Sequence, residues 1–117
     1  MKITIQSPKI TVSESQEEFI TNKLTRLDRL YDHIENCHVV FKKEKTDLKS
    51  SIIIEVKVAI PGNDLFASET SDSFELAVDK VYSNLESQLK KKKDKLYEQN
   101  RKAKKIIIDD GDFENKN

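Results

Sequence analysis

Residues 73–100 read SFELAVDKVYSNLESQLKKKKDKLYEQN, and this stretch decides the fold. Asp72 and Ser73 are candidate N-caps, and no Pro or Gly interrupts the run. After Leu89 the composition changes to lysine, with only Asp94 between Lys90 and Lys95. We therefore predict one long helix whose first half packs and whose second half presents positive charge. Its apolar residues recur at the spacing of one helix face: Phe74, Val78, Val81, Leu85, Leu89 and Leu96.

A strand and a second helix are predicted before this stretch. Residues 2–6 alternate between apolar and polar side chains, which is typical of a short strand. Ser13 and Gln16 match a capping box, so a helix is predicted over residues 14–33. The apolar face of that helix contains Ile20, Leu24, Leu27, Tyr31 and Ile34.

Three further strands are predicted between the helices, over residues 37–43, 51–59 and 65–70. The sequence Pro-Gly-Asn-Asp at 61–64 is a strong turn signal. Short connections make these strands an antiparallel meander. The order β-α-β-β-β-α predicts an α+β fold: a two-layer sandwich, with two helices on one face of a four-stranded sheet.

Composition fits one small domain, and the charge is distributed unevenly along it. The chain has 117 residues, with 21 basic and 21 acidic side chains. Residues 79–105 hold ten Lys/Arg against four Asp/Glu, a net of +6, whereas residues 106–117 have a net of −3. A total charge of zero therefore does not argue against an anionic partner.

The sequence also predicts the domain boundary and the compartment. We expect a domain over residues 1–100 and a flexible tail over 101–117, basic and then acidic, with Ile106–Ile108 outside any helix. The single cysteine rules out an intramolecular disulfide, and no signal peptide or long apolar span is visible. We expect a cytoplasmic protein that does not contact membranes.

The lysine run is the strongest functional signal, although a solvated helix end has a similar composition. Lys23, Arg26 and Arg29 form a second basic flank on the first helix. Helices packed side by side would bring both flanks to one groove, which favours a phosphate backbone as ligand. Only Tyr82 and Tyr97 are aromatic nearby, so we expect recognition of structured RNA rather than stacking on single-stranded bases.

No constellation for catalysis or metal binding is visible. His33, Cys37 and His38 are the only clustered donors, and Cys37 and His38 belong to opposite faces of a strand. Neither a nucleophile–base pair nor a Gly-rich phosphate loop occurs. We therefore expect no active site, no metal and no cofactor.

Taken together, these segments resemble the bacterial ribosome hibernation-promoting factor family, also called ribosome-associated inhibitor or sigma-54 modulation proteins. The resemblance covers about residues 1–97 and rests on segments in the right order rather than on one specific motif. At Asn84 and Ser87 this chain departs from the basic residues usual in the family. The matching segments are Lys23–Arg29, Val39–Lys45, Leu65–Ser68, and the helix positions from Phe74 through Leu85 and Leu89 to Lys91, Lys93 and Lys95.

The resemblance implies a non-enzymatic inhibitor of translation with a fold similar to a double-stranded-RNA-binding domain. Such a protein binds the small ribosomal subunit where mRNA and tRNAs would sit, under stress or in stationary phase. It implies the short form of the family, a monomer when free, without a small-molecule substrate. It leaves open whether the protein promotes or blocks ribosome dimers. The implied rRNA-binding residues are Lys23, Arg26, Arg29, Lys42, Lys45, Lys80, Lys91, Lys93 and Lys95.

Two functions of other classes stay open at this stage. A protein-interaction adaptor or transcription modulator would dock its basic helix on an acidic partner, as the name sigma-54 modulation suggests. An enzyme is the third alternative, and no arrangement of residues supports it.

Overall fold

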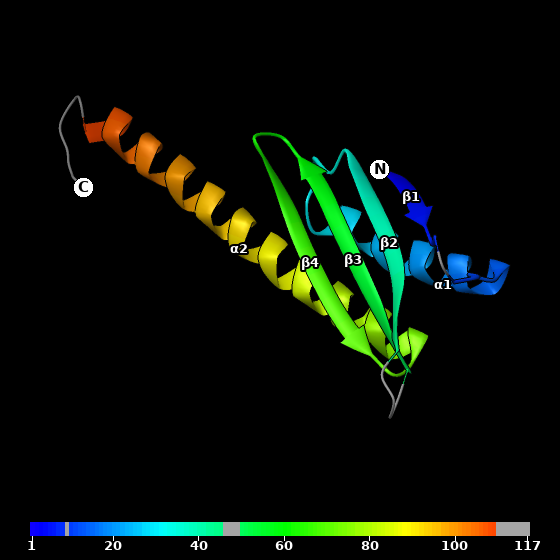
Figure 1. Cartoon of the computed structure of the whole chain (residues 1–117). Helices are drawn as coiled ribbons and strands as arrows, with labels where there is room; N and C mark the ends of the chain where they lie inside the picture. Colours follow the sequence, from blue (N-terminus) through cyan, green and yellow to red (C-terminus); the bar gives the residue numbers. More distant parts are fainter. Residues whose placement is uncertain (9, 46–49, 110–117) are drawn as a thin grey trace.

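The computed structural model describes residues 1–8, 10–45 and 50–109, with the backbone alone for 96–109. It is a four-stranded sheet with two helices on one face (Figure 1). This confirms the predicted α+β sandwich. The elements are β1 (Lys2–Gln6), α1 (Glu14–Thr25), the short 3-10 helix η1 (Arg26–Arg29), β2 (Asn36–Lys45), β3 (Ser50–Ile60), β4 (Asn63–Ser71) and α2 (Phe74–Asp109).

The strand order β1-β2-β3-β4 follows the chain, and only the first pair is parallel. The predicted meander is confirmed, since β2 pairs antiparallel with β3 and β3 with β4. Gly62 closes the β3–β4 hairpin with φ +84°, a conformation that suits a residue without Cβ. Between β1 and β2 the chain must cross over, and α1 makes that crossover.

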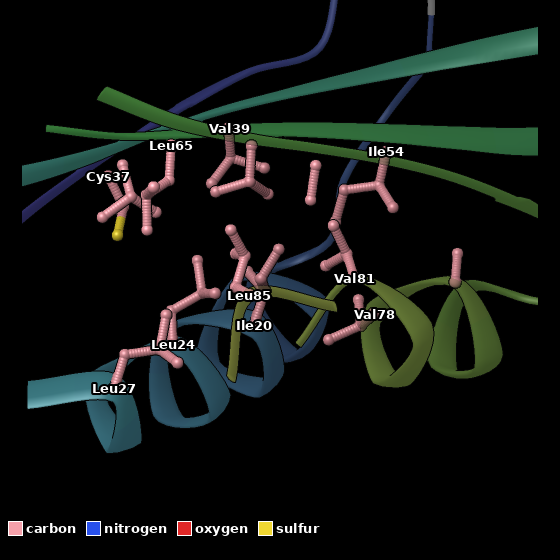
Figure 2. Packing of buried hydrophobic residues seen from close by; sticks show 14 of the residues in the cluster. Ile20, Leu24, Leu27, Cys37, Val39, Ile54, Leu65, Val78, Val81 and Leu85 are labelled. Atoms are coloured by element: carbon pink, nitrogen blue, oxygen red, sulfur yellow. The ribbon is translucent and has the colours of Figure 1, made fainter. Parts of the chain in front are cut away.

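The core lies between the sheet and the two helices (Figure 2). Alternation along β2 and β3 sends every second side chain inward, including Val39, Val56 and Val58, which are fully buried. On the helix side of the core, Leu24 of α1 and Leu85 of α2 pack against the sheet, and neither has any exposed surface. Each buried aliphatic side chain contributes roughly 1.5–3 kcal/mol to the stability of this layer.

Both helices begin where their sequences predict. Ser13 Oγ accepts from the backbone N–H of Gln16 at 3.1 Å, while Gln16 Oε1 accepts from the N–H of Ser13 at 2.9 Å. This reciprocal pair is the predicted capping box. At α2, Ser73 Oγ accepts from the N–H of Leu76 at 3.1 Å, so Ser73 caps the long helix.

Two predicted helix ends are wrong. The first helix, predicted to run to residue 33, ends as an α-helix at Thr25 and tightens into η1, because the chain must turn to enter β2 at Asn36. The second helix continues beyond residue 100 to Asp109, so Ile106–Ile108 lie within it and not outside any helix. Of the predicted tail, residues 110–117 lie outside the part described, and the division at residue 100 stays a prediction.

The helices run side by side in the same direction. Phe19 of α1 lies 6.3 Å from Phe74 of α2, and Lys23 lies over the ring of Tyr82. Later residues of α1 thus meet later residues of α2. Figure 2 shows the same order, with Leu27 toward one end of the core, Ile20 and Leu85 near its middle, and Val78 toward the other end.

Candidate RNA-binding surface

The lysine run begins where α2 leaves the core. Among the side chains that the structure describes, Leu89 is the last fully buried one of the helix, and Lys90, Lys91, Lys93 and Lys95 are all exposed. Lys92 is only partly exposed, because it follows Leu85 and Leu89 along the apolar stripe. Within the part of the chain that the structure describes, none of the four exposed lysines forms an ion pair. No carboxylate of the described residues therefore neutralises their charge.

Arg26 and Arg29 lie toward the same end of the sandwich. Both arginines belong to η1, which follows α1 and Lys23 in the chain, and both are exposed. Leu27 lies between them in the sequence and is fully buried. Because α1 and α2 run in the same direction, these arginines advance toward the end where α2 leaves the sheet. We call the four exposed lysines 90, 91, 93 and 95 together with Arg26 and Arg29 the basic end.

Lys23 does not share this exposure. Its ammonium lies 3.0 Å from Asp79 Oδ1 and 5.3 Å from the ring centre of Tyr82, and only 23% of its side chain is exposed. Asp79 Oδ1 is shielded from solvent and, apart from this ion pair, has no hydrogen-bond partner among the described residues. The charge of Lys23 therefore compensates Asp79 and fastens α1 to α2.

On the other side of α2, three side chains contact the edge strand β4. Lys80 Nζ donates to the carbonyl oxygen of Thr70 at 3.2 Å, and Gln88 Nε2 donates to that of Phe66 at 2.9 Å. Between them, Asn84 Nδ2 donates to Glu69 Oε2 at 3.0 Å, and Asn84 Oδ1 accepts from Gln88 at 2.7 Å. We call Lys80, Asn84 and Gln88 the polar ladder. It covers backbone acceptors that an edge strand would otherwise present to solvent.

Sequence reasoning missed the polar ladder. Its signal was the spacing of four residues between Lys80, Asn84 and Gln88, which places them one turn apart along the flank of the apolar stripe. Lys80, proposed from the resemblance as an rRNA ligand, already contacts Thr70. Together with Lys91 and with Glu69 of β4, these residues line an open hollow along this flank of the helix.

Lys42 and Lys45 lie away from the basic end. Residue 45 pairs with Ser50 at the far end of β2, near the start of α2. Lys42 belongs to the outer face of the sheet, opposite the helices, because it alternates with the buried Phe41. Its ammonium lies 3.2 Å from Glu55 Oε2. Lys42 and Lys45 therefore do not lie with the basic flanks of the two helices.

The buried thiol of Cys37 has no role at this surface. Burial raises the pKa of Cys37 to about 12, with a further contribution from Asp28, so the thiol keeps its proton. Cys37 Sγ lies 3.3 Å from Met1 Sδ, whereas His38 contacts Gln6 on the opposite face. Within the described ranges, no three His, Cys, Asp or Glu side chains are placed to hold a metal ion.

Comparison with known proteins decides the family. Residues 3–97 match the family described as sigma 54 modulation protein / S30EA ribosomal protein. The chain belongs to this family. Among S30EA-related proteins, the ribosome hibernation promoting factor of Escherichia coli K12 is 31% identical over 96 residues, which cover 82% of this chain and 97% of the relative. That of Pseudomonas putida KT2440 is 30% identical over 95 residues, covering 81% and 89%.

Solved structures support the same assignment. A ribosomal subunit interface protein from Coxiella burnetii superposes with a TM-score of 0.70 at 30% identity, covering 80% of this chain and 98% of that structure. The N-terminal domain of Thermus thermophilus Protein Y shares the fold, with a TM-score of 0.69 at 24% identity, covering 78% and 98%. In this S30EA-family chain, no helix within the described ranges is long and apolar enough to cross a bilayer.

Proposed function

We propose that this protein binds the small ribosomal subunit through its rRNA, where mRNA and tRNAs would sit, and inhibits translation under stress or in stationary phase. The observation that supports this most is the basic end: four exposed lysines of α2 without an ion pair among the described residues, and two exposed arginines of η1 toward the same end of the sandwich. Such a cluster suits a row of phosphates, whose counterions are released on binding.

The fold supplies the rigidity that this role requires. Leu85 and Leu89 fix α2 against the sheet, and Lys23 holds α1 beside it. The arginines and lysines are therefore held on two packed elements rather than on a flexible chain. Recognition of structured RNA by shape and backbone needs such fixed spacing between cations.

The names of the relatives supply the ribosome as the target. The matched proteins of E. coli and P. putida are ribosome hibernation promoting factors, and the C. burnetii structure is a ribosomal subunit interface protein. Within the proposal, Arg26, Arg29, Lys91, Lys93 and Lys95 make the main phosphate contacts. Lys23 and Lys80 support the surface through their internal contacts, and Lys42 and Lys45 contact rRNA from the far end of the sheet.

The proposal is tested by sedimentation of purified small subunits with the protein, with and without mRNA and tRNA. The expected result is co-sedimentation that added mRNA and tRNA abolish, together with inhibition of translation in a purified system. Binding that persists unchanged beside bound mRNA and tRNA would contradict the proposed position. A protein that stays in the free fraction would contradict ribosome binding altogether and favour an acidic protein as its partner.

A further inference from the structure

The end of α2 extends beyond the region that this chain shares with its relatives. The family match ends at residue 97, whereas the helix continues to Asp109. The E. coli relative is covered over 97% of its length by a match that includes 82% of this chain. At a rise of about 1.5 Å per residue, positions 98–109 add roughly 18 Å of helix. We call residues 98–109 the arm.

The domain fixes the direction of the arm. Just before the helix leaves the sheet, Gln88 is bonded to the backbone of β4 and Leu89 is fully buried in the core. From that point α2 continues past the β3–β4 hairpin and away from the sheet (Figure 1). The result is an elongated molecule, 68 Å long against 28 and 19 Å in its other dimensions.

In the sequence, basic residues continue from the lysine run into the arm. Arg101, Lys102, Lys104 and Lys105 place four cations within five residues. Position 102 follows Lys91 by eleven residues and Lys95 by seven, so all three positions fall on one side of the helix. Lys91 and Lys95 are exposed there and have no ion pair within the described part of the chain.

This charge favours an anion along the helix. Residues 90–109 contain nine Lys or Arg and three Asp or Glu. Like charges four residues apart destabilise a helix, as at Lys91 and Lys95 and at Arg101 and Lys105. Phosphates along the helix would remove this repulsion, whereas the arm of a second copy would add to it. A nucleic acid backbone is therefore the occupant that fits.

We propose that the arm contacts rRNA phosphates outside the footprint of residues 1–97, as a second RNA-binding segment that this chain adds to its family domain. The inference rests on the proposed function, since the same rRNA must first hold the domain. The arm then lengthens the contact along the RNA. Its effect on affinity is electrostatic and declines with salt.

The test uses the full chain with Lys102→Gln and Lys105→Gln, because Gln removes charge and keeps helix propensity. The matched control is Lys2→Gln with Lys57→Gln, which removes the same charge from two exposed positions in the sheet. Affinity for purified small subunits is measured across a salt series, and hydroxyl-radical footprinting maps the protected rRNA.

The arm variant is expected to bind roughly tenfold more weakly at low salt, with a log–log salt slope shallower by about 1.5. It is also expected to lose one outlying patch of protection, while the control behaves like wild type. Equal salt slopes for the arm variant and wild type, or an equal loss of affinity in the control, would overturn the proposed role of the arm and leave the proposed function standing. Wild-type protein that does not bind subunits would overturn both.

Discussion

The two halves of α2 differ in how they meet the rest of the molecule. From Phe74 to Leu89 the helix has a regular apolar stripe, packed against the sheet, and a polar flank bonded to β4. From Lys90 to Lys95 the exposed lysines have no ion pair within the described chain. One continuous helix therefore joins an anchored half to a free, charged half. The regular period accounts for the fold, and the point where it breaks accounts for the proposed function.

The outer face of the sheet shows that lysine content alone does not make a binding surface. There Lys42 lies 3.2 Å from Glu55, and Lys57 lies 3.4 Å from Asp64. These pairs are solvent-exposed and contribute little stability, but they neutralise the local field. The lysines after Leu89 differ because no described carboxylate pairs with them.

The largest expected effect comes from breaking the anchored half. Leu85→Ala removes a fully buried side chain and should lower the free energy of unfolding by about 2–5 kcal/mol. Leu76→Ala, on the same helix but 55% exposed, is the matched control and should change stability by less than about 0.5 kcal/mol. Urea denaturation measures both. Similar losses in the two variants would contradict the assignment of the packed face.

A smaller effect is expected from the polar ladder. Asn84→Ala with Gln88→Ala removes the bonds to Glu69 and Phe66 and should cost roughly 1–2 kcal/mol. Hydrogen exchange should become faster in β4 and stay unchanged in β2. Ser87→Ala, an exposed neighbour on the same helix, is the control. Unchanged exchange in β4 would show that the ladder does not hold the edge strand.

Lys23 tests the difference between a lysine that holds the two helices together and a lysine of α2 that has no ion pair among the described residues. Lys23→Met should destabilise the fold by about 0.5–1 kcal/mol, because Asp79 loses the ammonium that compensates its charge. Lys93→Met should leave stability unchanged and weaken ribosome binding more than Lys23→Met does. The two variants are compared by thermal unfolding and by subunit affinity. The reverse ranking for affinity would make Lys23 a direct ligand.

The last effect appears only at alkaline pH and concerns the core end nearest the free half, where Cys37 is buried (Figure 2). Burial raises the pKa of Cys37 to about 12, while an unfolded thiol ionises near its ordinary value of 9.0. The unfolded chain therefore releases this proton first, and stability should fall as pH rises from 9 toward 12. Between about pH 8 and about pH 10, wild type should lose more stability than Cys37→Ala. Equal losses would show that solvent reaches the thiol.

The sequence predicted the elements that depend on local periodicity. The capping box at Ser13, the alternation along β3 and the stripe from Phe74 to Leu89 were enough to predict the layers. The ends of the two helices were predicted less accurately. Thr25 ends α1 because the chain must reach β2, and that constraint belongs to the assembled sheet rather than to the local sequence.

The candidate site could be predicted only in part. The charge run after Leu89 is visible in the sequence, and its exposure follows from the broken stripe. The internal partners of Lys23 and Lys80 are not visible, because Asp79 and Thr70 come near them only when the layers pack. Which lysines are free is a property of the tertiary structure, so nine proposed ligands could not be ranked beforehand.

The central claim is that the free half of α2 holds rRNA while the anchored half holds the fold. It is tested most directly by Lys91→Glu, Lys93→Glu and Lys95→Glu combined, with affinity for small subunits measured beside urea unfolding. Lys2→Glu combined with Lys57→Glu is the control, since these two exposed lysines are not among the proposed rRNA ligands. Affinity should fall at least roughly a hundredfold in the first variant alone, at unchanged stability. Unchanged affinity in a folded first variant, or an equal fall in the control, would contradict the account.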